Sequence, residues 1–436
     1  MRHTKSTTIP SIPDALTAPF APVRAVFHAA SWELLWRVGL GLVVGDAGHS
    51  LVRAALVGPW TAQWRRLHRC FHRNAWPERA VIAALVTSVL LLLYGSGLPD
   101  RLFWAVDTTL TPHPGAPHMP GVSLRCRSRC RPGETRRVPG HQWVVLAHLW
   151  ERAGCWVGLP VGARLVTPAS RPLIVLHWLV SAAHLPLSSL LVVDRGLATK
   201  ALLRWAVPRR LHVLGRLKRS TVVYDPPPPR PAPPGPGRPR EYGPPHPVPA
   251  LPPTRTRPGA TTLVYQGKTV AVTFQQGCFR WRRVPGLLRV LVVTGPWAQP
   301  WYLRCTDRAL DPARAVRASA ARWQVEVLTQ DSQRLGLGHY RGRTARGVRR
   351  WPLVVCLATC VLPWLRLERI HLPLPAVSWP WYPVQNTPGM TQVRLQACWA
   401  TWQAHHHCSP DAHGPPIPTK IPDPVSDTLG GPMVSR

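Results

Sequence analysis

Three carboxylates occupy positions in the sequence where a metal-dependent enzyme would need them. Asp107 follows the short apolar run 102–106, Asp194 follows the apolar run 190–193, and Glu326 lies in a segment of helical periodicity. Side chains at the carboxyl ends of neighbouring strands converge above an open α/β sheet, where ligands bind in such folds. Two carboxylates in that position repel one another unless a cation neutralises them. We therefore expect Asp107, Asp194 and Glu326 to bind metal together.

A site of three carboxylates favours Mg²⁺ or Mn²⁺, because both ions prefer oxygen ligands. Two such ions about 3.5 to 4 Å apart can activate a water or a DNA 3′-hydroxyl and stabilise the leaving oxygen. This is the chemistry of phosphodiester cleavage and strand transfer. A single Asp after a strand is more often a turn or helix-capping residue, so the hypothesis depends on all three acids.

The arginine nearest to the third acid has two possible roles. Arg322 stands four residues before Glu326, so the two side chains share one face of a helix. They could form only a surface ion pair. If the face instead looks into the active site, Glu326 would bind metal while Arg322 meets a phosphate.

The charge balance indicates a polyanionic partner. The chain has 54 Lys and Arg residues against 19 Asp and Glu residues, a formal net charge of +35 at pH 7. Such a surface attracts nucleic acid, and the planar guanidinium of arginine binds phosphate through two hydrogen bonds. A coding bias that enriches Arg, Pro and Trp is an alternative explanation of the composition. It does not explain where the three acids stand.

Several classes of protein are disfavoured. The apolar stretch 81–97 is shorter than the roughly 20 residues that a bilayer span requires, so a buried helix is the better interpretation and no membrane partner is expected. No apolar segment typical of a cleaved signal peptide precedes Ala29. The ten cysteines are scattered without a repeated C-x-x-C spacing, which favours reduced thiols and a cytoplasmic location.

The periodicity of apolar residues changes along the chain. Helical spacing over 31–97 predicts several packed helices. Buried-strand runs follow, each of which we expect to be followed by a helix, at 102–106, 142–147, 155–161 and 190–193. A proline-rich tract at 225–259 precedes a predicted β-meander at 261–265, 270–274 and 287–293. Helices are predicted at 313–335 and 344–365, the second of them broken at Pro352 and Pro363.

These patterns divide the chain into six parts with an interrupted α/β core. The parts are a loose lead-in (1–30), an N-terminal helical DNA-binding region (31–98), the first part of the core (99–215), a Pro-rich and β-rich insertion (216–300), the second part of the core (301–372) and an irregular C-terminal tail (373–436).

The residues around the acids resemble a known family. The matching segments are Val106–Thr109 at the first acid, Gly140–Trp143, Val193–Gly196 at the second acid, Gly215–Leu217, Arg322–Glu326 at the third acid, Leu335–Leu337 and Tyr340–Arg343. Together they resemble the DDE transposases of bacterial insertion sequences, in the branch whose RNase H-like catalytic core is interrupted by a β-rich insertion. The resemblance spans about residues 30 to 365.

The resemblance implies a fold and an activity. The fold would be an RNase H-like mixed sheet flanked by helices, with an N-terminal helical domain and the insertion. The enzyme would cleave DNA at insertion-sequence ends and join them to target DNA, as a homodimer on paired ends. Asp107, Asp194 and Glu326 would be catalytic and would hold Mg²⁺ or Mn²⁺. The residues expected to bind nucleic acid are Arg216, Lys218, Arg322, Arg334, Arg341 and Arg343.

Two positions depart from the family pattern. Ser319 stands where the family commonly has a tyrosine, and Gln333 where it commonly has a lysine that contacts the transposon end. A catalytically inactive DNA-binding derivative is therefore an alternative function. A membrane-associated protein built around residues 81–97 is a third. Trp281, Trp297 and Trp301 could stack on an unpaired base, or they could be core residues.

Overall fold

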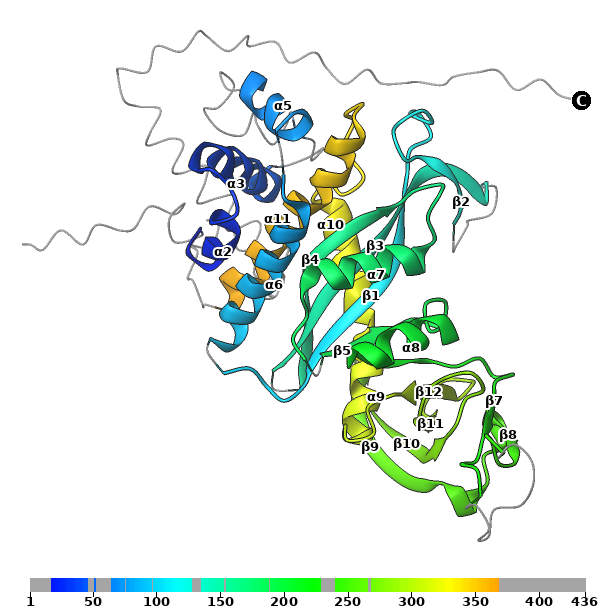
Figure 1. Cartoon of the computed structure of the whole chain (residues 1–436). Helices are drawn as coiled ribbons and strands as arrows, with labels where there is room; N and C mark the ends of the chain where they lie inside the picture. Colours follow the sequence, from blue (N-terminus) through cyan, green and yellow to red (C-terminus); the bar gives the residue numbers. More distant parts are fainter. Residues whose placement is uncertain are drawn as a thin grey trace, which may run out of the picture.

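A ten-stranded mixed sheet organises the part of the chain that the computed structural model describes, which comprises residues 17–45, 51, 64–74, 76–95, 97–127, 135–152, 154–187, 189–228, 240–265 and 268–367 (Figure 1). In spatial order the strands are β2 (Ser123–Cys126), β3 (Arg137–Arg152), β1 (Leu102–Pro112), β5 (Ser189–Val193), β6 (His212–Arg216), β12 (Trp301–Cys305), β11 (Leu288–Thr294), β10 (Lys268–Phe279) and β9 (Arg257–Tyr265), and β4 (Cys155–Val166) pairs with β3.

The parallel centre of the sheet positions the first two acids. β1 pairs with β5 and β5 with β6, both in parallel, and Val106 lies opposite Val193. All residues of β5 and the first five of β1 are buried, as expected for strands covered on both faces. The next residue after each of the two opposed valines is an aspartate, so Asp107 and Asp194 lie at the same level, where the parallel pairing ends.

The prediction that the first strand ends at Val106 is wrong. β1 continues to Pro112, and Asp107 lies inside it, opposite Val145 of β3. The strand continues because the 16-residue β3 still offers backbone partners beyond the point where β5 ends. Only the parallel pairing stops at Val106.

The prediction of a helix after every strand is also wrong. β1, β3 and β4 form antiparallel pairs, which need no helical crossover. Helices do follow the third and fourth of the predicted strand runs, α7 (Pro172–Ala183) after β4 and α8 (Lys200–Ala206) after β5.

The predicted meander is confirmed, and it extends the core sheet. β9, β10 and β11 are consecutive antiparallel strands, and β11 pairs with β12. β12 then pairs with β6 of the core, with Leu303 opposite Arg216, so the insertion does not form a separate sheet. β7 (Val222–Tyr224) and β8 (Pro245–Pro247) form a small pair beside this extension.

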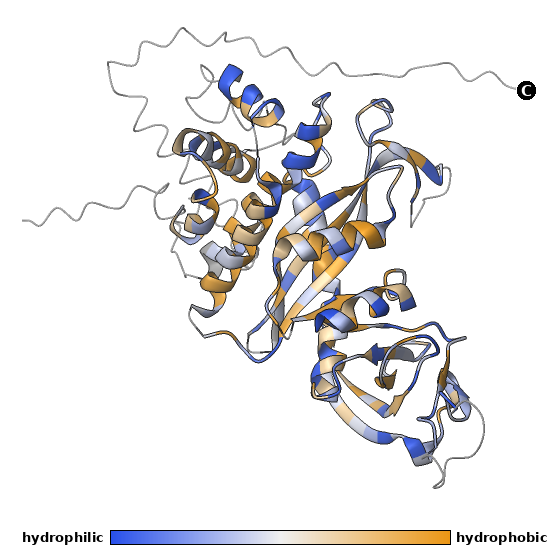
Figure 2. Ribbon diagram, viewed as in Figure 1, coloured by the Kyte–Doolittle hydropathy of each residue, from blue (hydrophilic) through white to orange (hydrophobic). Residues whose placement is uncertain are grey.

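The N-terminal helices pack with the last described helix. These are α3 (Ala29–Val44), α5 (Trp64–His72) and α6 (Glu78–Tyr94), all in contact with α11 (Ala345–Leu367), which also packs on β4. Hydrophobic residues gather on α3, α6 and α11, whereas α5 is mainly hydrophilic (Figure 2). Part of the predicted loose lead-in is helical, as η1 (Ala18–Phe20) and α2 (Ala21–Arg24), and buries Phe20 and Val23.

The membrane-like stretch 81–97 falls largely on α6. The helix buries Val81, Leu85 and Val89 within the hydrophobic core. Among the helices that the structure describes, none combines the length and hydropathy that a bilayer span requires.

The predicted break of the last helix is wrong, because α11 runs through both Pro352 and Pro363. A proline inside a helix costs about 3 kcal/mol. Burial of the surrounding side chains, including Trp351, Val355 and Val361, offsets this cost. The predicted tail 373–436 lies outside the described residues.

Candidate active site

The two aspartates are held by backbone hydrogen bonds at the ends of the parallel pairing. The Oδ1 atom of Asp107 accepts a hydrogen bond of 2.7 Å from the N–H of Thr108. The Oδ1 atom of Asp194 accepts one of 2.8 Å from the N–H of Leu197, at the turn into α8. A Cβ atom at Gly196 would lie 3.1 Å from Asp194 Oδ2, so this glycine leaves the second carboxylate oxygen accessible.

The third acid is brought to the sheet by a helix. Glu326 lies in the first turn of α10 (Trp323–Arg334), which packs on β1, β3 and β4. α10 lies on the opposite face of the sheet from α7 (Figure 1). It follows α9 (Pro312–Ala321), and Arg322 is the residue between the two helices.

Arg322 joins two of the three carboxylates. Its Nη1 atom donates to Asp107 Oδ2 at 2.8 Å, and its Nη2 atom donates to Glu326 Oε1 at 2.6 Å. The side chains of Arg322 and Asp107 are only 19% and 18% exposed. The pair with Glu326 therefore faces Asp107 across the site, rather than lying on a solvated helix face.

All three acids contribute to one electrostatic field. Burial raises the pKa of Asp107, and the charges of Asp194 and Glu326 raise it further against the opposing effects of Arg322 and of the Thr108 N–H. Burial would lower the pKa of Arg322, but the carboxylates of Asp107, Glu326 and Asp194 outweigh it and raise that pKa. The charges of these three acids and of Arg322 therefore act on one another.

The donor set suits a divalent cation, but its present arrangement is closed by Arg322. Carboxylate oxygens are the ligands that Mg²⁺ and Mn²⁺ prefer. As the side chains stand, no group of three His, Cys, Asp or Glu residues in the described ranges is placed to hold a metal ion. One carboxylate oxygen of Asp107 and one of Glu326 are bonded to the Arg322 guanidinium instead.

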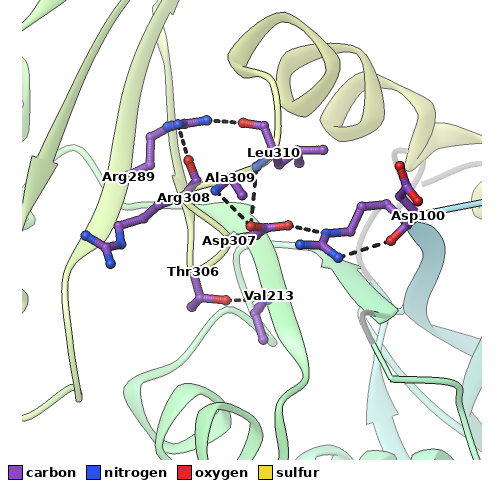
Figure 3. Close-up of polar contacts among 9 residues, drawn as sticks. Asp100, Val213, Arg289, Thr306, Asp307, Arg308, Ala309 and Leu310 are labelled. Carbon is purple, nitrogen blue, oxygen red and sulfur yellow. Dashed lines mark hydrogen bonds and ion pairs between the residues drawn. The ribbon is translucent and has the colours of Figure 1, made fainter.

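A buried carboxylate after β12 holds the loop that leads into α9, whose first turn is capped by Asp311. Asp307 is 2% exposed and binds Arg101, the residue before β1 (Figure 3). It also accepts hydrogen bonds of 2.9 Å from the N–H of Ala309 and 3.3 Å from that of Leu310. The chain that leads to Glu326 is thus tied to the beginning of the strand that carries Asp107.

This seam has further hydrogen bonds in the same close-up. Arg289 of β11 donates to the carbonyls of Arg308 and Leu310, and the N–H of Val213 in β6 donates to Thr306 Oγ1 at 2.8 Å (Figure 3). Sequence analysis missed Asp307 and Arg101 as positioning residues. The only available signal was an isolated acid in a basic segment.

One of the remaining predicted DNA-binding residues lies beside the carboxylates. Burial lowers the pKa of Arg216, the neighbouring charge of Arg322 lowers it further, and Glu326 opposes both. The Arg216 guanidinium lies 4.2 Å from the ring centre of Trp301, which stacks on Trp297 at 3.8 Å. The other four are exposed and away from these contacts, namely Lys218, Arg334, Arg341 and Arg343.

The two departures from the family pattern have defined surroundings. The Nε2 atom of Gln333 donates to Thr109 Oγ1 at 2.9 Å and approaches the carbonyl of Leu110 at 3.5 Å, so its side chain is bound to β1 close to Asp107. Ser319 is 7% exposed inside α9. A larger side chain at that position would have to displace packed neighbours.

Comparisons with known proteins found one distant structural match and no match in sequence. No protein-family model and no curated protein matches the sequence. One solved structure that matches is the cryo-EM structure of the piggyBac transposase synaptic complex with hairpin DNA, at 9% sequence identity and a TM-score of 0.38. The match covers 91% of this chain and 79% of that chain. At this TM-score the likeness carries no argument about fold or function.

Proposed function

We propose that this chain is a DDE-type transposase that cleaves DNA at the ends of an insertion sequence and transfers the freed strand to target DNA. One observation carries the proposal. Asp107 and Asp194 directly follow the last paired residues of the parallel strands β1 and β5, and Arg322 bonds to both Asp107 and the helical Glu326. The basic charge of the whole chain, +35, provides the attraction to DNA.

The roles of the residues follow from their positions. Asp107, Asp194 and Glu326 would hold Mg²⁺ or Mn²⁺, which supplies an activated hydroxyl and stabilisation of the leaving oxygen. Arg322 is close enough to the acids to bind the phosphate that reacts. Arg216 would hold the adjoining phosphate or base. The exposed cations Lys218, Arg334, Arg341 and Arg343 would bind the flanking backbone.

The finer assignments belong to the same proposal. The core would be RNase H-like and composed of residues 99–215 and 301–372, with residues 216–300 as the insertion and 31–98 as the N-terminal DNA-binding region. In this proposal the exposed arginines of α5, Arg65, Arg66 and Arg69, contact the DNA backbone. The active form would be a homodimer on paired ends in the bacterial cytoplasm.

A cleavage assay tests the proposal. The DNA should carry the element's own ends, and Mg²⁺ or Mn²⁺ should be titrated with the wild type, Asp107→Ala, Glu326→Ala and the control Asp331→Asn. Asp331 is an acid on the same helix that is bound to Arg334 at 3.7 Å, away from the three carboxylates. We expect cleavage by the wild type and the control only, with DNA binding retained in all four proteins. Cleavage that persists in Glu326→Ala would contradict the proposal.

The alternative of an inactive DNA-binding derivative is favoured by one contact. Gln333 is hydrogen-bonded to β1, so its side chain is not directed toward DNA as a lysine would be. This alternative predicts DNA binding that is weakened by salt, and no cleavage at any metal concentration. Gln333→Lys is the first substitution to test, because it restores the lysine that the family commonly has at this position. Ser319→Tyr is a poor choice because Ser319 is buried.

A further inference from the structure

The guanidinium of Arg322 stands where the carboxylates would need a cation. It bonds to Asp107 and Glu326 at 2.8 and 2.6 Å, and its charge also interacts with Asp194. Without it, three acids in a partly buried site would repel one another at close range. Arg322 therefore supplies the charge that allows these acids to gather without metal.

We propose that Arg322 is an internal counter-ion that competes with the divalent cation for Asp107 and Glu326 and is displaced when metal binds. This inference rests on the proposed metal site, and it concerns how that site opens. The guanidinium and the ion need the same carboxylate oxygens, Asp107 Oδ2 and Glu326 Oε1. Binding of one cation therefore excludes the present contacts of the other.

The surroundings of Arg322 indicate what favours its release. The charge of Arg322 disfavours the charged form of Arg216, since it helps burial to lower the pKa of Arg216. A guanidinium released from the carboxylates is repelled by Arg216 unless an anion joins the two. A DNA phosphate is such an anion, because each guanidinium can bind it through two hydrogen bonds. Phosphate and metal should therefore bind with positive coupling, while either one alone meets the closed site.

Mn²⁺ binding in the absence of DNA tests the competition directly. Isothermal titration calorimetry would compare the wild type with Arg322→Gln, Arg322→Lys, Glu326→Gln and the control Arg317→Gln. Arg317 lies on the adjoining helix α9 and bonds to Thr261 at 3.1 Å, so its loss removes one positive charge without opening the carboxylates. Circular dichroism of each variant checks that it is folded.

The expected result is an ordered series of affinities. Arg322→Gln should bind Mn²⁺ about tenfold more tightly than the wild type, since a unit charge removed at this range in a partly buried site has at least that effect. Arg322→Lys should fall between them, because one ammonium replaces a two-point contact. Glu326→Gln should lose affinity, and Arg317→Gln should match the wild type within about twofold.

A second readout covers the case in which Arg322→Gln is poorly folded. Without metal its melting temperature should be lower than that of the wild type, because Asp107 and Glu326 lose their counter-charge. Saturating Mn²⁺ should raise it by more than it raises that of the wild type. Arg322→Lys, which keeps the charge, should show the same pattern to a smaller degree.

The outcomes separate the inference from the proposed function. If Arg322→Gln and the wild type bind Mn²⁺ equally while Glu326→Gln loses binding, the competition is refuted and the metal site stands. Weaker binding by Arg322→Gln would also refute it, since Arg322 would then be needed to assemble the acids. If no protein binds Mn²⁺ in a way that depends on Glu326, both the inference and the proposed function fail.

Discussion

Two arginines are withdrawn from water in different regions of this molecule, and their surroundings are opposite. Arg322, at the edge of the core, bonds to two carboxylates and lies near a third. Arg304, in β12 of the extension, is fully buried against the ring of Trp281 at 4.6 Å, and its three guanidinium nitrogens have no hydrogen-bond partner within the described residues. Burial lowers the pKa of Arg304 to about 9, whereas the acids raise that of Arg322.

The difference is that Arg322 has carboxylate partners that compensate its buried charge, whereas Arg304 has none in the part of the chain that the structure describes. An ionised group taken out of water is costly unless an opposite charge is fixed beside it. The core provides such partners at the active site and at the seam between Asp307 and Arg101. Within the described residues, no acid is hydrogen-bonded to the Arg304 guanidinium. A compensated charge should therefore be costly to disturb, and Arg304 should be replaceable.

The largest expected effect comes from breaking the compensated pair at the seam. Asp307→Ala should lower the free energy of unfolding by about 3 kcal/mol. It leaves Arg101 without its ion-pair partner and removes the acceptor of the Ala309 and Leu310 N–H groups. Urea denaturation measures this change. Asp307→Asn, which keeps an acceptor but removes the charge, should cost less. Equal stability of Asp307→Ala and the wild type would show that the seam does not depend on charge compensation.

A smaller effect on the free energy of unfolding is expected when the pH is lowered, because His148 is buried in its neutral form. His148 is fully buried, bonds to Tyr94 at 2.9 Å, and has a pKa lowered to about 3 by burial. In the unfolded chain His148 binds a proton near pH 6.5, whereas in the folded chain it stays neutral until about pH 3. The free energy of unfolding therefore falls as the pH drops below 6.5. Over pH 6.5 to 5 the loss is about 2 kcal/mol from this residue.

Urea unfolding at several pH values checks this sign. His148→Gln should reduce the slope of the free energy of unfolding against pH by about one proton. His113, whose pKa burial lowers to about 4, should maintain part of the slope in this variant. An unaltered slope in His148→Gln would mean that His148 can be protonated in the folded protein.

Removal of the uncompensated charge should have a still smaller effect. Arg304→Met keeps the length of the side chain and its contact with Trp281, so the free energy of unfolding should be unchanged or rise by about 1 kcal/mol. Thermal unfolding of the two proteins measures it. A loss of more than about 2 kcal/mol would show that Arg304 has a partner after all, and would end the contrast with Arg322.

The smallest expected effect comes from adding a charge beside the compensated site. Gln333→Lys exchanges the hydrogen bond to Thr109 for a cation near the predicted DNA path. The slope of log affinity against log salt concentration should steepen by about one, with a gain of a few-fold in affinity at low salt. Fluorescence anisotropy measures both quantities. The exposed Gln275→Lys on β10 is the control, and an equal gain there would indicate only non-specific attraction.

Much of the core could be predicted because burial on both faces produces a local signal. The apolar runs before Asp107 and Asp194 indicate strands without reference to any partner, and the periodicity around Glu326 indicates a helix. The β-meander was predictable from its short apolar runs, although β9 and β10 are mostly exposed. These local signals placed Asp194 after its strand and Glu326 on a helix, whereas Asp107 lies inside β1 and not after it.

What could not be predicted depends on distant partners. Residues 108–112 are strand only because β3 pairs with them. Pro352 and Pro363 stay helical because the packing of α11 outweighs their local cost. The bond from Arg322 to Asp107 crosses 215 residues of sequence, and no periodicity signals it.

The most direct test of the central claim is a crystal structure with Mn²⁺ and an anomalous difference map at the manganese edge. We expect a peak within coordination distance of carboxylate oxygens from Asp107, Asp194 and Glu326, with the Arg322 guanidinium moved away from Asp107 and Glu326. A map with no peak at these carboxylates, and Arg322 still bonded to both at saturating Mn²⁺, would contradict a metal-dependent active site at this position.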